Sequence, residues 1–266
     1  MNIIYKPDEL IESIKRIKQE RGVLSNCFEN PATFSQNFEA YEMSHSVLIV
    51  KHEYRVDRML FYTSDPAELI LLTHHLPKGQ YYLDMLTKDP SLMREILLEG
   101  EFNCVAEMER LSSSDITLVL EKDSQVMQYF DRNYGEIATL SDTDEIYDLL
   151  WRIFSTGVSH LPDREQLSQS ISAGEILVNR GDDGIDALLQ TVVKPKSFYI
   201  NQVYNGSRTR GIHAMMLNRL MDYHSNGGRY VYAWVDRNNT ASQKFHKKYG
   251  LTHDGLWNMV YQLDIL

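Results

Sequence analysis

The sequence has few cysteines and no long apolar segment. Cys27 and Cys104 are the only cysteines in 266 residues, and they show no C-x-x-C spacing. This excludes a disulfide framework and a zinc ribbon, and we expect two free thiols in a cytoplasmic protein. The apolar stretches around residues 47–50 and 69–72 are far shorter than the ~18 residues of a membrane-spanning helix. Charges interrupt the N-terminal segment too early for a signal peptide, so we expect neither secretion nor a membrane partner.

Basic residues are also scarce. The chain has 27 lysines and arginines against 37 aspartates and glutamates, a net charge of −10. Because an acidic protein repels polyanions, we expect no nucleic-acid partner. The histidines lack metal-ligand spacing such as H-E-x-x-H, so no metal is expected. Residues 1–140 carry 14 basic and 23 acidic side chains and residues 141–266 carry 13 and 14, which indicates two different modules.

The remaining composition is that of an ordinary globular protein, with 43% apolar and 24% charged residues. The length suits two domains, which we place at residues 1–135 and 136–266. In the first, apolar periodicity predicts a helix over residues 8–20. Between residues 45 and 110 we expect strand, strand, helix, strand, helix and strand, and helix 90–98 is the second helix of this series. The first domain is therefore predicted to be a mixed α+β domain.

The second domain is predicted to be α/β with a mixed sheet. Two helices come first, at residues 142–154 and 162–171, and Asp142 with Glu145 is expected to form a capping box. Turn residues then separate three strands, a helix, a strand, a helix and a last strand. Their predicted ranges are 175–179, 184–193, 197–204, 212–226, 230–235, 239–249 and 256–263.

Residues 202–213, QVYNGSRTRGIH, connect a predicted strand to a predicted helix. Unpaired backbone N–H groups and the helix dipole converge at such a point, and Arg208 and Arg210 add two positive charges. The loop therefore suits a pyrophosphate, although a plain turn with solvated arginines is the alternative. It is neither a Walker loop nor a G-x-G-x-x-G fingerprint.

A second segment, residues 239–251 with the sequence NTASQKFHKKYGL, is predicted to be helical. Asn239, Ser242, His246 and Tyr249 are spaced by three, four and three residues, so they share one helix face. This polar stripe can line a cleft, and a solvated face is the alternative.

Both segments match patterns of one superfamily. Arg208-x-x-Gly211-x-His213 resembles the R-x-x-G-x-G/A loop of the GNAT acetyltransferase superfamily, and residues 239–251 resemble its late helix, N-x-x-A/S-x-x-x-Y-x-x-x-G-F. The resemblance covers residues 141–266. It implies a GNAT-type splayed-sheet α/β domain that binds an acyl-coenzyme A, with acetyl-CoA as co-substrate, between two central strands.

The resemblance also implies roles for single residues. The Val203 backbone would meet the thioester carbonyl and the pantetheine arm, Asn239 would hydrogen-bond the pantetheine, and Ser242 would lie beside it. The pyrophosphate would be held by the Arg208 side chain and the N–H groups of Ser207, Arg208, Thr209, Arg210, Gly211, Ile212 and His213. His246 would protonate the leaving thiolate, with Tyr249 as the spare donor.

Two positions depart from the superfamily's pattern. His213 replaces Gly or Ala, so its side chain either crowds a phosphate or contacts one. His246 replaces Tyr; histidine can donate a proton at neutral pH, and a surface histidine is the alternative interpretation. No general base is evident: the candidates are Asp186, Asp236 and Glu175, and attack by an already neutral amine needs none.

The first half repeats part of the order of elements in the second. Its corresponding loop, residues 62–66 with the sequence YTSDP, has neither glycine nor a basic residue, so it cannot hold a phosphate. We predict a degenerate copy of the same fold without coenzyme; an unrelated α+β domain is the alternative. This domain would line one side of the acceptor site or form a dimer contact. Its acidic charge would favour a cationic acceptor.

The function predicted on this basis is acyl-CoA-dependent N-acyl transfer, with acetyl passing to a primary amine of a small-molecule or peptide acceptor. A homodimer is expected. One alternative is a non-catalytic acyl-CoA-binding regulatory module. Another is an aminoacyl-tRNA-dependent transferase, which the net charge of −10 disfavours.

Overall fold

The computed structural model describes the chain except for residues 5, 28, 31–37, 92, 117–133, 195 and 207–210. It divides into two compact units. Unit 1 comprises Met1–Glu107, Ser155–His160 and Trp257–Leu266, and unit 2 comprises Met108–Phe154 and Leu161–Leu256. This division differs from the expected boundary after residue 135, because strands β7 (Asn103–Ser113) and β13 (Thr252–Ile265) each pass from one unit into the other.

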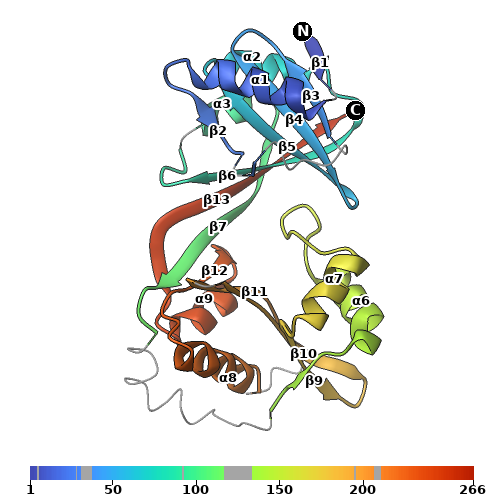
Figure 1. The fold of residues 1–266 in the computed structure, drawn as a ribbon, viewed down its shortest axis with the longest axis vertical. Coiled ribbons are helices and arrows are strands. Elements are labelled where there is room, and N and C mark those ends of the chain that lie inside the picture. The colour runs from blue at the N-terminus through green and yellow to red at the C-terminus, as the bar shows by residue number, and fades with distance from the viewer. Residues whose placement is uncertain are drawn as a thin grey trace. The chain divides into compact units, whose positions relative to one another are not determined.

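Unit 1 is a mixed sheet with helices on both faces (Figure 1). The strand order is β1-β3-β4-β5-β6-β13-β7, and the short strand β2 pairs with β5. The strands not yet located are β1 (Asn2–Ile4), β2 (Leu24–Ser25), β3 (Phe38–Glu42), β4 (Ser46–Glu53), β5 (Val56–Thr63) and β6 (Gly79–Thr87). The helices are α1 (Pro7–Lys18), α2 (Pro66–Thr73) and α3 (Arg94–Glu99).

Strand β4 explains why unit 1 needs helices on both faces. Val47 and Ile49 are packed in the core cluster of α1, whereas Leu48 and Val50 are packed in the cluster of α2 and α3. Successive side chains of a strand point to opposite faces of the sheet. Four consecutive apolar residues are therefore buried only if both faces are covered. The predicted stripe of helix α1 is confirmed, because Leu10, Ile14 and Ile17 are buried against this sheet.

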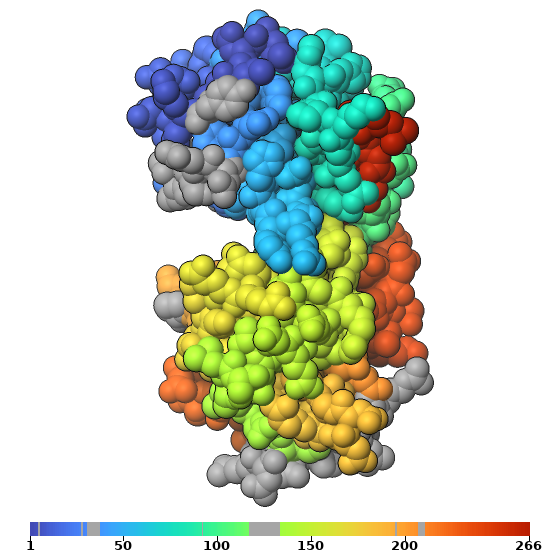
Figure 2. Space-filling model, turned by 90° about the vertical axis from the view of Figure 1, so that its right-hand side faces the viewer, coloured from blue at the N-terminus to red at the C-terminus, as the bar shows by residue number. Residues whose placement is uncertain are grey.

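In unit 2 the strand order is β7-β12-β11-β10-β9-β8. Its strands are β8 (Glu136–Ile137), β9 (Ile176–Gly181), β10 (Gly184–Lys194), β11 (Ser197–Asn205) and β12 (Val231–Asp236). Helices α6 (Thr143–Ile153) and α7 (Arg164–Ser172) share one core cluster, and α8 (Gly211–Ser225) and α9 (Thr240–Lys247) pack on the opposite face. Figure 2 shows that the yellow-green segment containing α6 and α7 covers much of one side of unit 2.

Each sheet is completed by a strand that is distant in sequence. In unit 1, β13 pairs antiparallel with β6 from Trp257↔Thr87 to Ile265↔Gly79. In unit 2, β12 pairs antiparallel with β7 from Val231↔Ser113 to Asp236↔Met108. A cut of the chain after residue 135 would therefore remove one strand from each sheet.

Several local predictions need correction. Asp142 does not form a capping box with Glu145: it closes a box with Thr139 at a short 3-10 helix, η2 (Leu140–Asp142). Glu145 instead accepts a hydrogen bond from the backbone N–H of Ile185 at 2.7 Å. The helix expected at residues 90–98 begins only at Arg94. The strands β1, β2, β3 and β8 were not predicted, because short strands carry too few residues for a period-2 pattern.

Across the described part of the chain, no helix combines the length and the apolar character needed to cross a membrane.

Candidate functional site

Strands β11 and β12 of unit 2 separate part-way along their length. They are parallel neighbours, but their register contains only Phe198↔Val231, Tyr199↔Tyr232 and Ile200↔Ala233. Beyond these pairs β11 continues to Asn205 and β12 to Asp236. The facing edges of the two strands are therefore not hydrogen-bonded to each other over their last residues, which leaves backbone donors and acceptors directed into the split.

A β-bulge lies where the split begins. Strand β10 pairs Gln190 with Gln202 and Thr191 with Ile200, so Asn201 is the extra residue on β11. A bulge bends the strand that carries it and increases its local twist. Asn201 thus accounts for the departure of β11 from β12 immediately after Ile200.

Val203 lies in the split part of β11, three residues after the last pair with β12. The residues predicted for the pyrophosphate fall into two groups. Ser207, Arg208, Thr209 and Arg210 lie outside the described residues. Gly211, Ile212 and His213 form the first turn of α8, whose backbone N–H groups point toward the start of the helix. The Ile212 side chain belongs to the core, with 2% exposure.

Gly211 is explained by a contact that the motif did not predict. A Cβ atom at this position would lie 1.5 Å from Cζ of Tyr134. The Tyr134 ring thus lies over the first residue of α8, and any side chain at position 211 would collide with it.

His213 is directed to α9 rather than to the start of its own helix. Its Nδ1 lies 2.8 Å from the Tyr249 hydroxyl, and its ring lies 5.0 Å from that of Phe245. Burial, with a smaller contribution from Lys248, lowers the pKa of His213 to about 4. The large side chain in place of Gly or Ala is accommodated by packing, and Tyr249 is itself buried at 1% exposure.

The polar stripe of α9 is exposed at Asn239, half-buried at Ser242 and buried at His246 and Tyr249. Asn239 caps the helix, because its Oδ1 accepts from the backbone N–H of Ser242 at 3.0 Å. His246 is 3% exposed and its Nδ1 lies 2.8 Å from the carbonyl oxygen of Ser242. The interpretation of His246 as a surface histidine is therefore wrong.

The contacts of His246 define its tautomer. A carbonyl oxygen only accepts, so Nδ1 carries the proton and Nε2 is left with a lone pair. Nε2 is buried and has no hydrogen-bond partner among the described residues. Burial lowers the pKa of His246 to about 4, because the apolar surroundings disfavour the charged form more than the Ser242 backbone contact favours it.

The candidate bases have separate positions. Asp186 lies on β10 and accepts from the Asn179 side chain at 2.8 Å. Asp236 ends β12 and accepts from the backbone N–H of Asn238 at 2.7 Å. Glu175 precedes β9, and its carbonyl oxygen accepts from the N–H of Thr191. No group of three or more His, Cys, Asp or Glu residues suited to a metal ion occurs among the described residues.

Unit 1 contains a second split of the same kind. Strands β5 and β6 are parallel and pair only at Asp57↔Tyr81 and Arg58↔Tyr82, although both continue for several residues. Here the chain itself enters the split. Strand β2 pairs with the end of β5 at Leu24↔Thr63 and Ser25↔Tyr62.

The next residue, Asn26, spans this split. Its Nδ2 donates to the carbonyl oxygens of Met59 and Asp84, both at 3.0 Å, and its Oδ1 accepts from the N–H of Phe61 at 2.7 Å. Asn26 is 3% exposed. The backbone groups that a ligand would bind in such a split are thus already paired in unit 1.

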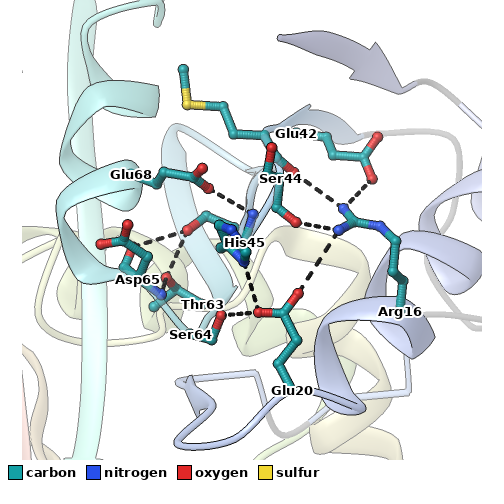
Figure 3. Close-up of polar contacts among 11 residues, drawn as sticks. Arg16, Glu20, Glu42, Ser44, His45, Thr63, Ser64, Asp65 and Glu68 are labelled. Carbon is teal, nitrogen blue, oxygen red and sulfur yellow. Dashed lines mark hydrogen bonds and ion pairs between the residues drawn. The ribbon is translucent and has the colours of Figure 1, made fainter.

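Acidic groups surround the start of α2, which is the counterpart of α8. Asp65 caps the helix by accepting from the N–H of Ala67 at 3.0 Å. Figure 3 shows Glu20 and Glu68 on either side of His45, whose Nδ1 and N lie 2.9 and 2.7 Å from their carboxylates. The hydrogen bond with Glu20 raises the pKa of His45. The three carboxylates disfavour a phosphate at this helix start.

Several solved structures of N-acetyltransferases have a similar fold. A GCN5-related N-acetyltransferase from Sphaerobacter thermophilus superimposes with a TM-score of 0.55 and 14% identity, over 83% of this chain and 80% of that one. A tandem GNAT protein from the clavulanic acid biosynthesis pathway gives 0.52 and 9%, over 85% and 82%. A GNAT-family acetyltransferase from Colwellia psychrerythraea gives 0.51 and 13%, over the whole of both chains.

No protein-family model and no curated protein sequence matches the chain. Identities of 9–14% support the fold alone. The superposition over most of each chain shows that this chain has the GNAT fold, and one of the neighbours is a tandem GNAT protein.

Proposed function

We propose that unit 2 binds an acyl-coenzyme A in the split between β11 and β12 and transfers the acyl group, acetyl in the simplest case, to a primary amine. The observation that carries this proposal is the end of the β11–β12 pairing at Ile200↔Ala233. Free strand edges can pair with an extended ligand that has amide groups, as the pantetheine arm does. Val203 lies in this free part of β11, two residues after the bulge residue Asn201.

The phosphate end of the ligand is assigned to the start of α8. The first-turn N–H groups of Gly211, Ile212 and His213 and the helix dipole favour an anion there. Ser207 and Thr209 contribute backbone N–H groups, and Arg208 and Arg210 contribute charge, as the superfamily's pattern implies. Tyr134 lies over Gly211, so we expect its ring to contact the bound coenzyme or to move when the coenzyme binds.

The proton balance of the reaction involves His246. The amine nitrogen attacks the thioester carbon, the C–S bond breaks, the amine loses a proton and the sulfur gains one. Nδ1 of His246 already donates to Ser242, so Nε2 must take up a proton before it can give one. In this proposal the amine releases its proton to water, and Nε2 takes up a proton and transfers it to sulfur. A pKa of about 4 makes the protonated ring a strong donor.

Tyr249 is left with a supporting role. Its hydroxyl contacts both Nδ1 and the carbonyl oxygen of His213, which fixes α9 against α8. Asn239 uses its oxygen as the helix cap, so its Nδ2 is the group that would donate to pantetheine, with Ser242 beside it.

One observation favours a second candidate, a non-catalytic acyl-CoA-binding module. The neutral His246 has no proton on Nε2, and the chain would then bind coenzyme without turnover. Turnover with primary amines distinguishes the two candidates.

Isothermal titration calorimetry with acetyl-CoA tests coenzyme binding, which both candidate functions require. We expect micromolar binding by the wild type and at least tenfold weaker binding by an Arg208→Ala, Arg210→Ala double variant. The matched control is an Arg152→Ala, Arg164→Ala double variant, which removes two exposed arginines from α6 and α7 and should bind normally. No binding of acetyl-CoA or coenzyme A by the wild type would contradict the proposal.

A further inference from the structure

Two buried glutamines face each other on neighbouring strands beside the split. Gln190 on β10 and Gln202 on β11 are direct antiparallel partners. Their exposures are only 3% and 4%. The Oε1 atom of each is buried and has no hydrogen-bond partner among the described residues. The Nε2 atom of Gln190 donates to Ser170 Oγ at 3.4 Å, a long contact.

Burying two adjacent oxygen atoms without hydrogen-bond partners lowers the stability of a folded core. A buried polar atom without a partner costs roughly 1–3 kcal/mol, and most such atoms are paired. Apolar residues of similar size, such as Met, would avoid this cost at both positions. The arrangement is therefore better explained by a ligand that donates hydrogen bonds than by packing.

The position of the pair links it to the split. Gln202 follows the bulge residue Asn201 and lies two residues after the last β11–β12 pair, Ile200↔Ala233. Directly opposite residues of an antiparallel pair have Cβ atoms ~4.5–5.5 Å apart. Two such carboxamide oxygens can accept from the same donor group.

The face on which the glutamines lie is separate from that of His246. Leu188 and Tyr204 are direct partners, each two positions away from the glutamine of its own strand, and both pack in the cluster of α6 and α7. Gln190 and Gln202 alternate with Leu189 and Val203, which belong to the α8 and α9 side, so the glutamines share the face of Leu188 and Tyr204. A ligand held by the glutamines thus approaches the split from the face opposite to α9.

We propose that Gln190 and Gln202 bind the attacking amino group of the acceptor in its neutral form. This inference rests on the proposed function and adds the acceptor half of the same site. A primary amine has two N–H donors, one for each carboxamide oxygen. Because the oxygens carry no full charge, they do not stabilise an ammonium ion as a carboxylate would, and the nucleophilic lone pair is retained.

The side-chain amide signals of the two glutamines test this directly in NMR spectra of the full chain. The probes are methoxyamine, a weakly basic amine, and ethylammonium, which is charged at neutral pH. We expect methoxyamine to shift the amide signals of Gln190 and Gln202 saturably, in the presence of coenzyme A, and ethylammonium at the same concentration to leave them unchanged. The Gln190→Met and Gln202→Met variants assign the two signals.

A matched control is available in Gln243 of α9. It is also buried, at 8% exposure, with an unpaired Oε1, and it donates to Glu109 from Nε2 at 3.1 Å. Its signal should not respond to methoxyamine. Absence of a shift at both Gln190 and Gln202, or an equal shift at Gln243, would overturn the inference.

A kinetic measurement separates binding of the amine from a merely structural role. With methoxyamine as acceptor and thiol release as readout, Gln190→Met and Gln202→Met should raise the acceptor KM about tenfold and leave the acetyl-CoA Kd unchanged. Gln202→Glu should shift the pH–rate profile to higher pH, because a carboxylate stabilises the protonated amine. Unchanged acceptor KM in both Met variants contradicts the inference, whereas absent acetyl-CoA binding by the wild type contradicts only the proposed function.

Discussion

Asn26 donates a hydrogen bond to the carbonyl oxygen of Asp84, across a gap that the strands of unit 1 leave open. The same carboxamide also donates to Met59 and accepts from Phe61. One side chain thus connects β5 to β6 beyond Arg58↔Tyr82, the point where their own pairing ends. Unit 1 has the split of the GNAT fold, but its own chain fills it.

Replacing Asn26 should therefore destabilise unit 1. Asn26→Ala removes three hydrogen bonds and leaves the backbone groups of Met59, Phe61 and Asp84 unpaired, at a cost of roughly 2–4 kcal/mol. The measurement is urea unfolding. The control is Asn226→Ala, an exposed carboxamide whose Nδ2 donates to Asp222, which should change stability by less than about 0.5 kcal/mol. Equal effects of the two substitutions would show that Asn26 does not join the strands.

Gly211 and Tyr134 should show strong coupling. Gly211→Ala places a methyl group 1.5 Å from the Tyr134 ring and should destabilise the chain. In a Tyr134→Ala background the same substitution should be neutral or stabilising by up to ~1 kcal/mol, because alanine is the better helix former. A thermal-unfolding double-mutant cycle measures this change of sign. Additive effects would mean that the ring does not lie over Gly211.

His246 should make the fold sensitive to acid. Its pKa is lowered to about 4 in the folded chain from an ordinary value of 6.5. Between pH 6.5 and pH 4 the unfolded chain binds a proton that the folded chain does not, so stability falls as the pH falls, by up to about 1.4 kcal/mol per pH unit for this group. Urea unfolding between pH 8 and pH 4.5 should therefore show a smaller loss of stability in His246→Leu than in the wild type. An identical pH dependence would indicate that His246 is not buried in its neutral form.

Much of the secondary structure could be predicted because its pattern is local. The apolar helix predicted at residues 8–20 and the helix predicted at 212–226 both appear close to those ranges, and the two strands expected after residue 45 are β4 and β5. The pairing of β13 with β6 was not predictable from the sequence. It joins residues 170 positions apart, such as Trp257 and Thr87, and local periodicity carries no information about such distant partners. For the same reason, the domain boundary expected after residue 135 does not account for the strands that each unit receives from the other half of the sequence.

The candidate site was predicted only where a motif marks it. The loop and helix patterns placed Val203 on a strand and His246 on a helix, where the structure has them, whereas Gly211 was expected in the loop and instead begins α8. The roles of these residues toward a coenzyme stay predictions. The roles of Asn26 and Tyr134 depend on what lies against them in three dimensions, which a single sequence does not contain. Gln190 and Gln202 gave one usable signal, a polar residue within an otherwise apolar strand pattern, but only the strand register shows that the two are partners.

We infer that the acyl donor binds in the split of unit 2 and not in that of unit 1. Native mass spectrometry with acetyl-CoA tests it most directly, because it counts bound molecules per chain. We predict one acetyl-CoA per wild-type chain and, at the same ligand concentration, a bound fraction at least severalfold smaller for the Arg208→Ala, Arg210→Ala double variant. Two bound molecules would contradict the closure of unit 1 by Asn26 and β2, and a wild-type chain that binds none would contradict the assignment of the β11–β12 split.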